Sequence, residues 1–211
     1  ANGEEVVTES RGQPRWSDKP LGRDGPSGDG DGSALQLGIF RVWSSPLSQG
    51  LLFPEDVSPI FDYDRYPLTA SARQAVEAFD PVADSPILNC VSKGMPTIME
   101  QPYPMRFFLR GGDIILHMEE FDTFRTIHMA PDATAEGQSG SKLGYSTGRW
   151  EEGSLIVITK YANWGYFDVV GVPLSEDPHI AERFTLNENG ARLDYTLTVT
   201  DPETFTEPVT L

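Results

Sequence analysis

Glu182 is the residue of this sequence whose type and spacing best fit chemistry. It lies in an alternating segment, residues 180–186, that faces a second one, residues 191–200, across the hairpin signal Asn187–Gly190. Opposite residues of an antiparallel pair share a face, and this pairing places Glu182 opposite Tyr195. The same face otherwise carries apolar side chains, namely Ile180, Phe184, Leu193 and Leu197. Glu182 is therefore expected to point into the apolar interior.

A carboxylate among apolar side chains must be paired or have a raised pKa, which leaves two interpretations of Glu182. In the first, an arginine inside the fold neutralises it and the pair holds the strands together. In the second, Glu182 is a general acid or base, assisted by Tyr195 or by His179 at the entrance to its strand. Isomerisation, elimination or hydration would fit this site, because the sequence shows no nucleophile and base pair for acyl transfer.

A second polar group is expected around the turn at Phe121. A turn centred on this residue pairs Glu119 with Thr123 and His117 with Arg125. Glu119, His117 and Arg125 would then share one face, which either lines a ligand cavity or faces solvent. A shift of one residue in the turn would break this arrangement.

The remaining candidates lie on or after the segment 145–151. Trp150 is expected to anchor the core opposite Leu155, and Gly148, which lacks a side chain, leaves room for Trp150 or a ligand to approach the sheet closely. The letters of residues 144–148 match a Gly-x-Ser-x-Gly elbow, but a hairpin follows instead of a helix, which disfavours a hydrolase. The candidate ligand-binding residues are Arg125, His117, Glu119, Tyr145, Trp150 and Asn163.

The elements that would position these residues are predominantly strands. Alternation predicts strands over residues 35–43, 105–109, 114–119, 123–129, 145–151, 155–161, 180–186, 191–200 and 205–211. One short helix is expected over residues 69–79, capped by Thr69 and stopped at Asp80-Pro81. Sequential antiparallel strands favour an all-β meander barrel that can enclose a small ligand, and a two-layer β-sandwich is the alternative.

The chain is expected to divide into an arm and one domain. Residues 1–33 are rich in glycine and aspartate and predict a flexible arm, and residues 34–211 form the β-domain. Such an arm suggests an alternative function, in which a structural or accessory subunit docks on a protein partner or on another copy through residues 1–33.

Composition excludes several classes of function. The net charge of −16, from 32 acidic and 16 basic residues, disfavours nucleic-acid binding. No apolar run is long enough to span a bilayer. Cys90 is the single cysteine and is expected to be buried, and the three histidines lack metal-ligand spacing, so neither a metal site nor a cofactor is expected.

Several short motifs resemble those of a large family of exported bacterial proteins. They are Gly144-Tyr145-Ser146-Thr147-Gly148-Arg149-Trp150-Glu151, Leu155-Ile156-Val157, Ser175-Glu176, Glu182-Arg183-Phe184 and Asp201-Pro202, within residues 85–205. The resemblance implies secretion and a compact, lipocalin-like β-structure, without implying an activity. The matching polar residues are Arg125, Asn163, His179 and Glu182. The chain departs from the family at Tyr145, where many relatives have histidine, and at Ile158, where they have an acid.

These observations lead to one expected function and one compartment. We expect a β-barrel that binds a small, largely apolar molecule and transforms it by acid/base chemistry at Glu182. The acidic, lysine-poor composition also favours export to the periplasm or the medium. The sequence opens at Ala1 without methionine, which fits removal of a signal peptide and equally fits the choice of segment.

Overall fold

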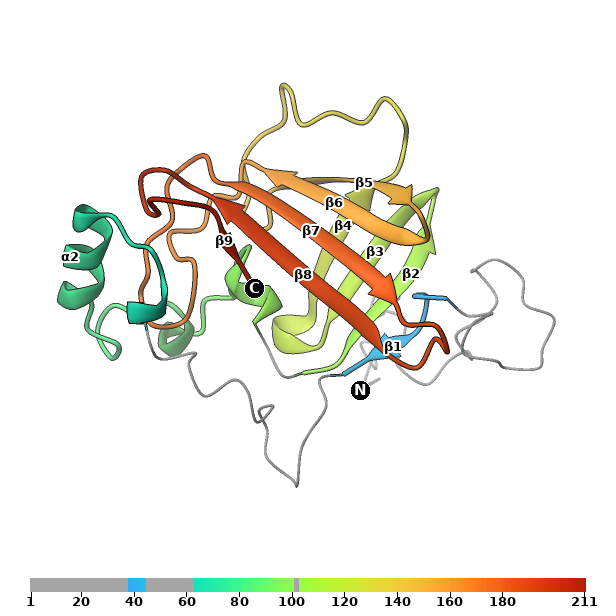
Figure 1. Ribbon diagram of the computed structural model, residues 1–211. Helices are drawn as coiled ribbons and strands as arrows, with labels where there is room; N and C mark the ends of the chain where they lie inside the picture. The colour runs from blue at the N-terminus through green and yellow to red at the C-terminus, as the bar shows by residue number, and fades with distance from the viewer. Residues whose placement is uncertain (1–37, 45–62, 101–102) are drawn as a thin grey trace, which may run out of the picture.

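The computed structural model describes residues 38–44, 63–100 and 103–211, which form a strongly curled β-sheet with a helical segment at its side (Figure 1). The predicted arm, residues 1–33, lies outside the described residues. Within these ranges the structure has nine strands: β1 (Val42–Trp43), β2 (Met105–Arg110), β3 (Asp113–Met118), β4 (Thr123–His128), β5 (Tyr145–Glu151), β6 (Ser154–Lys160), β7 (His179–Leu186), β8 (Leu193–Thr200) and β9 (Val209–Thr210). The all-β prediction is confirmed.

The strands follow one another in sequence order, as in a meander, within a single sheet. β1 and β9 form its two edges, and no ladder joins them within the described ranges, so the sheet is a half-barrel. One sheet that curls on itself fits the barrel prediction better than the two-layer sandwich. Every neighbouring pair is antiparallel except β4 and β5, which pair in parallel because residues 129–144 return the chain to the same end of the sheet.

The two predicted hairpins differ in register from expectation, with opposite consequences. In β7 and β8, Glu182 pairs with Leu197 and Tyr195 with Phe184, a shift of two residues that keeps every side chain on its predicted face. In β3 and β4, Arg125 pairs with Leu116 and His117 with Phe124. The predicted pairing of His117 with Arg125 is therefore wrong by one residue. The shift places Arg125 on the inner face of the sheet and His117 on its outer face.

The cause of the second shift is the turn between β3 and β4. Met118 pairs with Thr123, so the turn contains residues 119–122 instead of being centred on Phe121. The short 3-10 helix η5 (Glu120–Asp122) occupies it, and Phe121 and Asp122 have left-handed backbone angles, φ 54° and 49°. Two consecutive left-handed residues without glycine are uncommon, and no alternation pattern encodes them.

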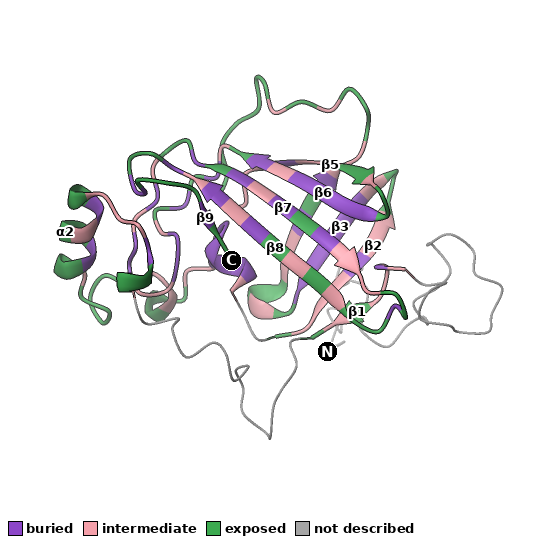
Figure 2. Ribbon diagram, viewed as in Figure 1, coloured by how far each residue is buried: buried purple, intermediate pink, exposed green. Residues whose placement is uncertain are grey.

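The concave face of the sheet encloses the core, which Figure 2 shows as buried stripes along the strands. Phe107 of β2 and Phe184 of β7 meet edge to face at 5.2 Å between ring centres. The 3-10 helix η4 (Thr97–Met99) adds Ile98 and Met99 to the same core. Each large apolar side chain buried here stabilises the fold by roughly 1.5–3 kcal/mol.

Gly148 of β5 shows how closely the core is packed. A Cβ atom at this position would lie 2.6 Å from both Ile127 and Met129. A close approach does occur at Gly148, but side chains of β4 and of the residue after it make it, and not Trp150 as predicted. Trp150, in contrast, is 47% exposed and touches Phe40 edge to face, so its prediction as a core anchor is wrong.

The predicted helix is confirmed as α2 (Ala70–Ala78), which lies beside the sheet (Figure 1). Thr69 caps it by accepting a hydrogen bond from the Ala72 amide at 3.2 Å, and it ends at Phe79. Phe79 packs against Gly171, where an added Cβ would lie 2.3 Å from its ring. This contact ties the end of α2 to the segment between β6 and β7.

Two further 3-10 helices lie in the connections, η2 (Tyr63–Arg65) and η3 (Ile87–Asn89). Cys90 follows η3 and is exposed, which corrects the prediction of a buried thiol. Within the part of the chain that the structure describes, no helix is both long and apolar enough to cross a membrane.

Candidate functional site

A buried ion pair between Arg125 of β4 and Glu182 of β7 crosses the interior of the half-barrel. Its side chains are 1% and 0% exposed. Arg125 donates from Nη1 to Glu182 Oε1 at 2.9 Å and from Nη2 to Oε2, so the pair is bidentate. Strands β5 and β6 separate β4 from β7 in the sheet, and the pair therefore joins strands that share no backbone ladder.

Three hydroxyl groups complete a network around this pair. Arg125 donates from Nε to Ser146 Oγ at 3.1 Å and from Nη2 to Thr159 Oγ1 at 2.8 Å. The Tyr195 hydroxyl donates to Glu182 Oε1 at 2.9 Å. We call these five residues the polar core network, to which each of the strands β4 to β8 contributes one side chain.

The electrostatics of the network keep Arg125 charged. Burial by itself lowers the pKa of Arg125, but the adjacent Glu182 carboxylate outweighs this effect and the pKa lies above its usual value. Burial, together with Glu182, raises the pKa of Tyr195 well above its usual range, so the phenol stays protonated as a donor. A paired and hydrogen-bonded carboxylate matches the first interpretation of Glu182, in which an internal arginine neutralises it.

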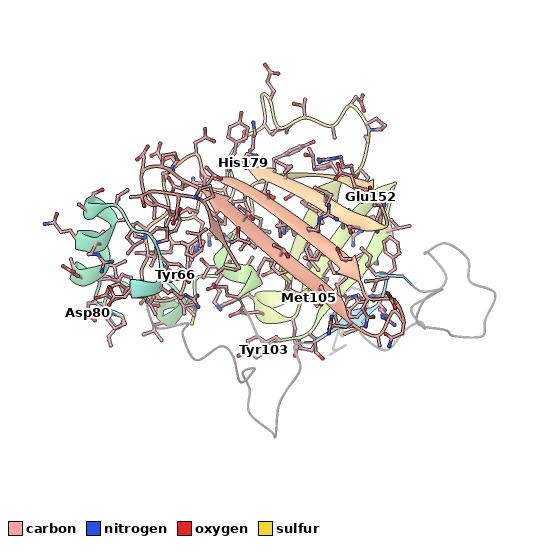
Figure 3. All side chains as sticks on the ribbon, viewed as in Figure 1. Tyr66, Asp80, Tyr103, Met105, Glu152 and His179 are labelled. Carbon is pink, nitrogen blue, oxygen red and sulfur yellow. The ribbon has the colours of Figure 1, made fainter. Side chains whose placement is uncertain are left out.

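The structure brings only one of the two predicted catalytic partners to Glu182. Tyr195 contacts it directly, whereas His179 is exposed and begins β7 (Figure 3). His179 lies three positions from Glu182, and odd separations along a strand point to opposite faces. His179 therefore lies outside the network.

The predicted ligand-binding residues are divided among several places. Arg125 belongs to the polar core network, but His117 is on the outer face, where it stacks on Phe124 at 4.0 Å and bonds Asp122 at 2.6 Å. Tyr145 stacks on the ring of His128 at 4.4 Å. The others are exposed: Trp150 at the end of β5, Asn163 after β6, and Glu119 before η5.

Glu119 lines a surface cleft of about 380 Å³, which we call the η5 cleft. Its wall consists of Ile87, Tyr103, Glu119, Glu120 and Phe121. Tyr103 and Phe121 are 45% and 43% exposed, an unusual exposure for large aromatic side chains. The sequence predicted that Glu119 shares a ligand site with His117 and Arg125. In the structure Glu119 lines a cleft, but neither of these two residues does.

Sequence reasoning missed a second group of acids, half-buried Glu100 and buried Asp168, which both act electrostatically on Tyr66. Figure 3 labels Tyr66 between α2 and the sheet. Burial and the neighbouring Asp168 raise the pKa of Glu100 to about 7. Burial raises the pKa of Asp168 to about 6, although the Val172 and Val170 amides donate to it. The buried oxygens Glu100 Oε2 and Asp168 Oδ2 have no hydrogen-bond partner among the residues that the structure describes.

One sequence signal could have found part of this acidic pair. Asp168 interrupts the apolar run from Phe167 to Val172, and a single acid in such a run indicates a buried carboxyl group. Glu100 follows a proline-rich segment without periodicity and gives no comparable signal.

Comparisons with known proteins give no match to this chain, whether with family models, curated proteins or solved structures. The resemblance to exported bacterial proteins therefore stays a prediction.

Proposed function

We propose that this protein binds a small, largely apolar molecule in the η5 cleft, on a half-barrel held together by the polar core network. The observation that carries the proposal is the contrast between these two places. The network uses both oxygens of Glu182 internally, whereas the cleft exposes aromatic surface. Its volume lies within the range of about 300–1,000 Å³ that small-molecule sites occupy.

The energetics favour a largely apolar ligand. Ile87, Tyr103 and Phe121 supply most of the wall, and covering such surfaces removes apolar area from water. Contiguous exposed aromatic surface in a hollow is typical of binding sites. The polar groups of the lining come from the consecutive residues Glu119 and Glu120 and would orient the ligand.

Binding of the neutral fluorescent probe N-phenyl-1-naphthylamine tests the proposal. We expect saturable fluorescence enhancement, and Phe121→Ser should weaken binding about tenfold because it removes an exposed aromatic ring from the lining of the cleft. Val82→Ser is the matched control, since Val82 is 75% exposed and does not line the cleft. Equal affinity of Phe121→Ser and the unchanged protein would refute the site.

A second candidate function is acid/base catalysis by Glu182, favoured by the hydrogen bond from Tyr195 to its carboxylate. Glu182→Gln separates the two roles. A structural role predicts a lower unfolding midpoint and unchanged probe binding in the cleft. A catalytic role predicts loss of turnover in a screen of isomerisation, elimination and hydration substrates, with the fold retained.

Export and assembly are separate parts of the proposal. The family resemblance and the acidic composition support export, and fractionation of cells that produce the full-length gene product should place it outside the cytoplasm. The alternative function, an accessory subunit docking through residues 1–33, predicts that deletion of this segment changes the mass measured by light scattering. An unchanged mass would contradict docking between copies.

A further inference from the structure

We infer that the ligand of the η5 cleft is an organic cation, with an ammonium group held between the Glu119 carboxylate and the rings of Phe121 and Tyr103. This inference rests on the proposed function and names the class of ligand. It is carried by the distribution of charge around the cleft and by the exposure of the two aromatic rings.

The charge accounting leaves one carboxylate at the cleft without a counter-ion. Glu120 pairs with Lys93 at 2.8 Å, and both side chains are at most 10% exposed, so this pair is neutral as a unit. Asp122, on the same turn, bonds His117 at 2.6 Å. Glu119 is exposed, and its carboxylate forms no ion pair or hydrogen bond within the described ranges. The cleft therefore presents the negative charge of Glu119 to a ligand.

The aromatic rings supply the second part of a cation site. The face of an aromatic ring attracts an ammonium group, and a nearby carboxylate adds to the attraction. Phe121 is 43% exposed although its turn is fixed by hydrogen bonds from the Asp122 amide to the Glu119 carbonyl and from Thr123 Oγ1 to the Glu120 carbonyl. This turn holds Phe121 in a left-handed conformation two residues from Glu119, on the wall of the same cleft.

The charge of the whole protein favours the same class of ligand. A net charge of −16 attracts cations and repels carboxylates and phosphates before they reach the surface. The carboxylate head group of a fatty acid would lie close to the Glu119 carboxylate, and the two negative charges would repel each other. A neutral apolar molecule would fill the cleft without using this carboxylate.

Three probes with the same alkyl tail test the inference by isothermal titration calorimetry: hexyltrimethylammonium, hexan-1-ol and hexanoate. We expect the cation to bind about tenfold more tightly than the alcohol, and the anion most weakly. Glu119→Gln should weaken the cation about threefold and leave the alcohol unchanged. Phe121→Leu should weaken the cation about fourfold while keeping an apolar side chain in place.

The control and the outcomes separate the two proposals. Glu188→Gln makes the same charge change at an exposed site outside the cleft and should leave all three affinities unchanged. Equal binding of cation and alcohol, with both lost in Phe121→Ser, would overturn the cation inference and keep the binding function. If the affinity for the cation fell equally in Glu119→Gln and Glu188→Gln, the net charge of the protein alone would explain the attraction. This result would also overturn the cation inference. Absence of binding by every probe would overturn both.

Discussion

Two regions of this half-barrel that remove acidic side chains from water treat charge in opposite ways. In the polar core network, Glu182 meets a bidentate arginine and a tyrosine hydroxyl. In the second region, Glu100 and Asp168 interact electrostatically, and each has a buried oxygen without a hydrogen-bond partner in the described part of the chain. Burial removes hydration from the carboxylates in both places, and the network replaces it at both oxygens of Glu182. The comparison teaches that acids removed from water can differ in the hydrogen bonds that replace their lost hydration.

Removing Arg125 should leave Glu182 without its partner, and we expect this change to have the largest effect on stability. Arg125→Met leaves Glu182 buried without its counter-ion, and we expect the free energy of unfolding to fall by about 3–5 kcal/mol. Urea unfolding followed by tryptophan fluorescence measures the change.

A double variant serves as the control for this prediction. Arg125→Met combined with Glu182→Leu removes both charges, so it should recover most of the lost stability. If the single and double variants were equally unstable, the loss would come from packing instead of the uncompensated carboxylate.

The pH dependence of stability should test the second region, which contains Glu100 and Asp168. The pKa values of Glu100 and Asp168, about 7 and about 6, lie above those of the unfolded chain, so the folded protein binds more protons between about pH 4 and pH 7. The stabilisation is therefore present at low pH and is lost as the pH rises through these values. We expect the free energy of unfolding to fall by on the order of 3 kcal/mol from pH 5 to pH 8.

Replacing both acids by their amides isolates their contribution to this slope. Glu100→Gln combined with Asp168→Asn should flatten the decrease between pH 5 and pH 8. Glu77→Gln, at an exposed position of α2, should leave the slope as it is. A slope that persists in the double amide variant would place the titrating groups elsewhere.

The smallest expected effect concerns the tyrosine of the network. Tyr195→Phe removes one hydrogen bond to Glu182 while Arg125 stays in place, and should cost about 1 kcal/mol of unfolding free energy. Tyr145→Phe is the matched control, because the ring of Tyr145 stacks on His128 but its hydroxyl has no partner among the described residues. Equal effects of the two variants would show that the Tyr195 hydroxyl adds nothing to the network.

Sequence reasoning succeeded where the signals are local. Thr69 and Asp80-Pro81 bound a helix because caps and breakers act within one turn, and the observed α2 agrees with the prediction. The strands β2 to β8 lie within two residues of their predicted bounds, because alternation reports a buried face directly. The first predicted strand, residues 35–43, is reduced to Val42–Trp43 among the described residues.

Sequence reasoning failed where a contact depends on curvature or on an unusual turn. Trp150 alternates correctly with its neighbours, yet it lies near the end of β5 and is half exposed. Glu100 was missed because its burial comes from segments distant in the chain. The η5 cleft was unpredictable for the same reason. Its lining combines Ile87 with the turn at residues 119–122, and the strands β2 and β3 lie between them in the chain.

The sequence by itself determined that Glu182 points inward, because a two-residue repeat keeps its faces under any even shift of register. Tertiary structure alone decided which group meets that carboxylate. The turn at residues 119–122 shifted β4 by one position and turned Arg125 inward, and the curl of the sheet then carried β4 to β7 across two intervening strands. Alternation describes one strand and its neighbours, whereas such a contact depends on the curvature accumulated over the whole sheet.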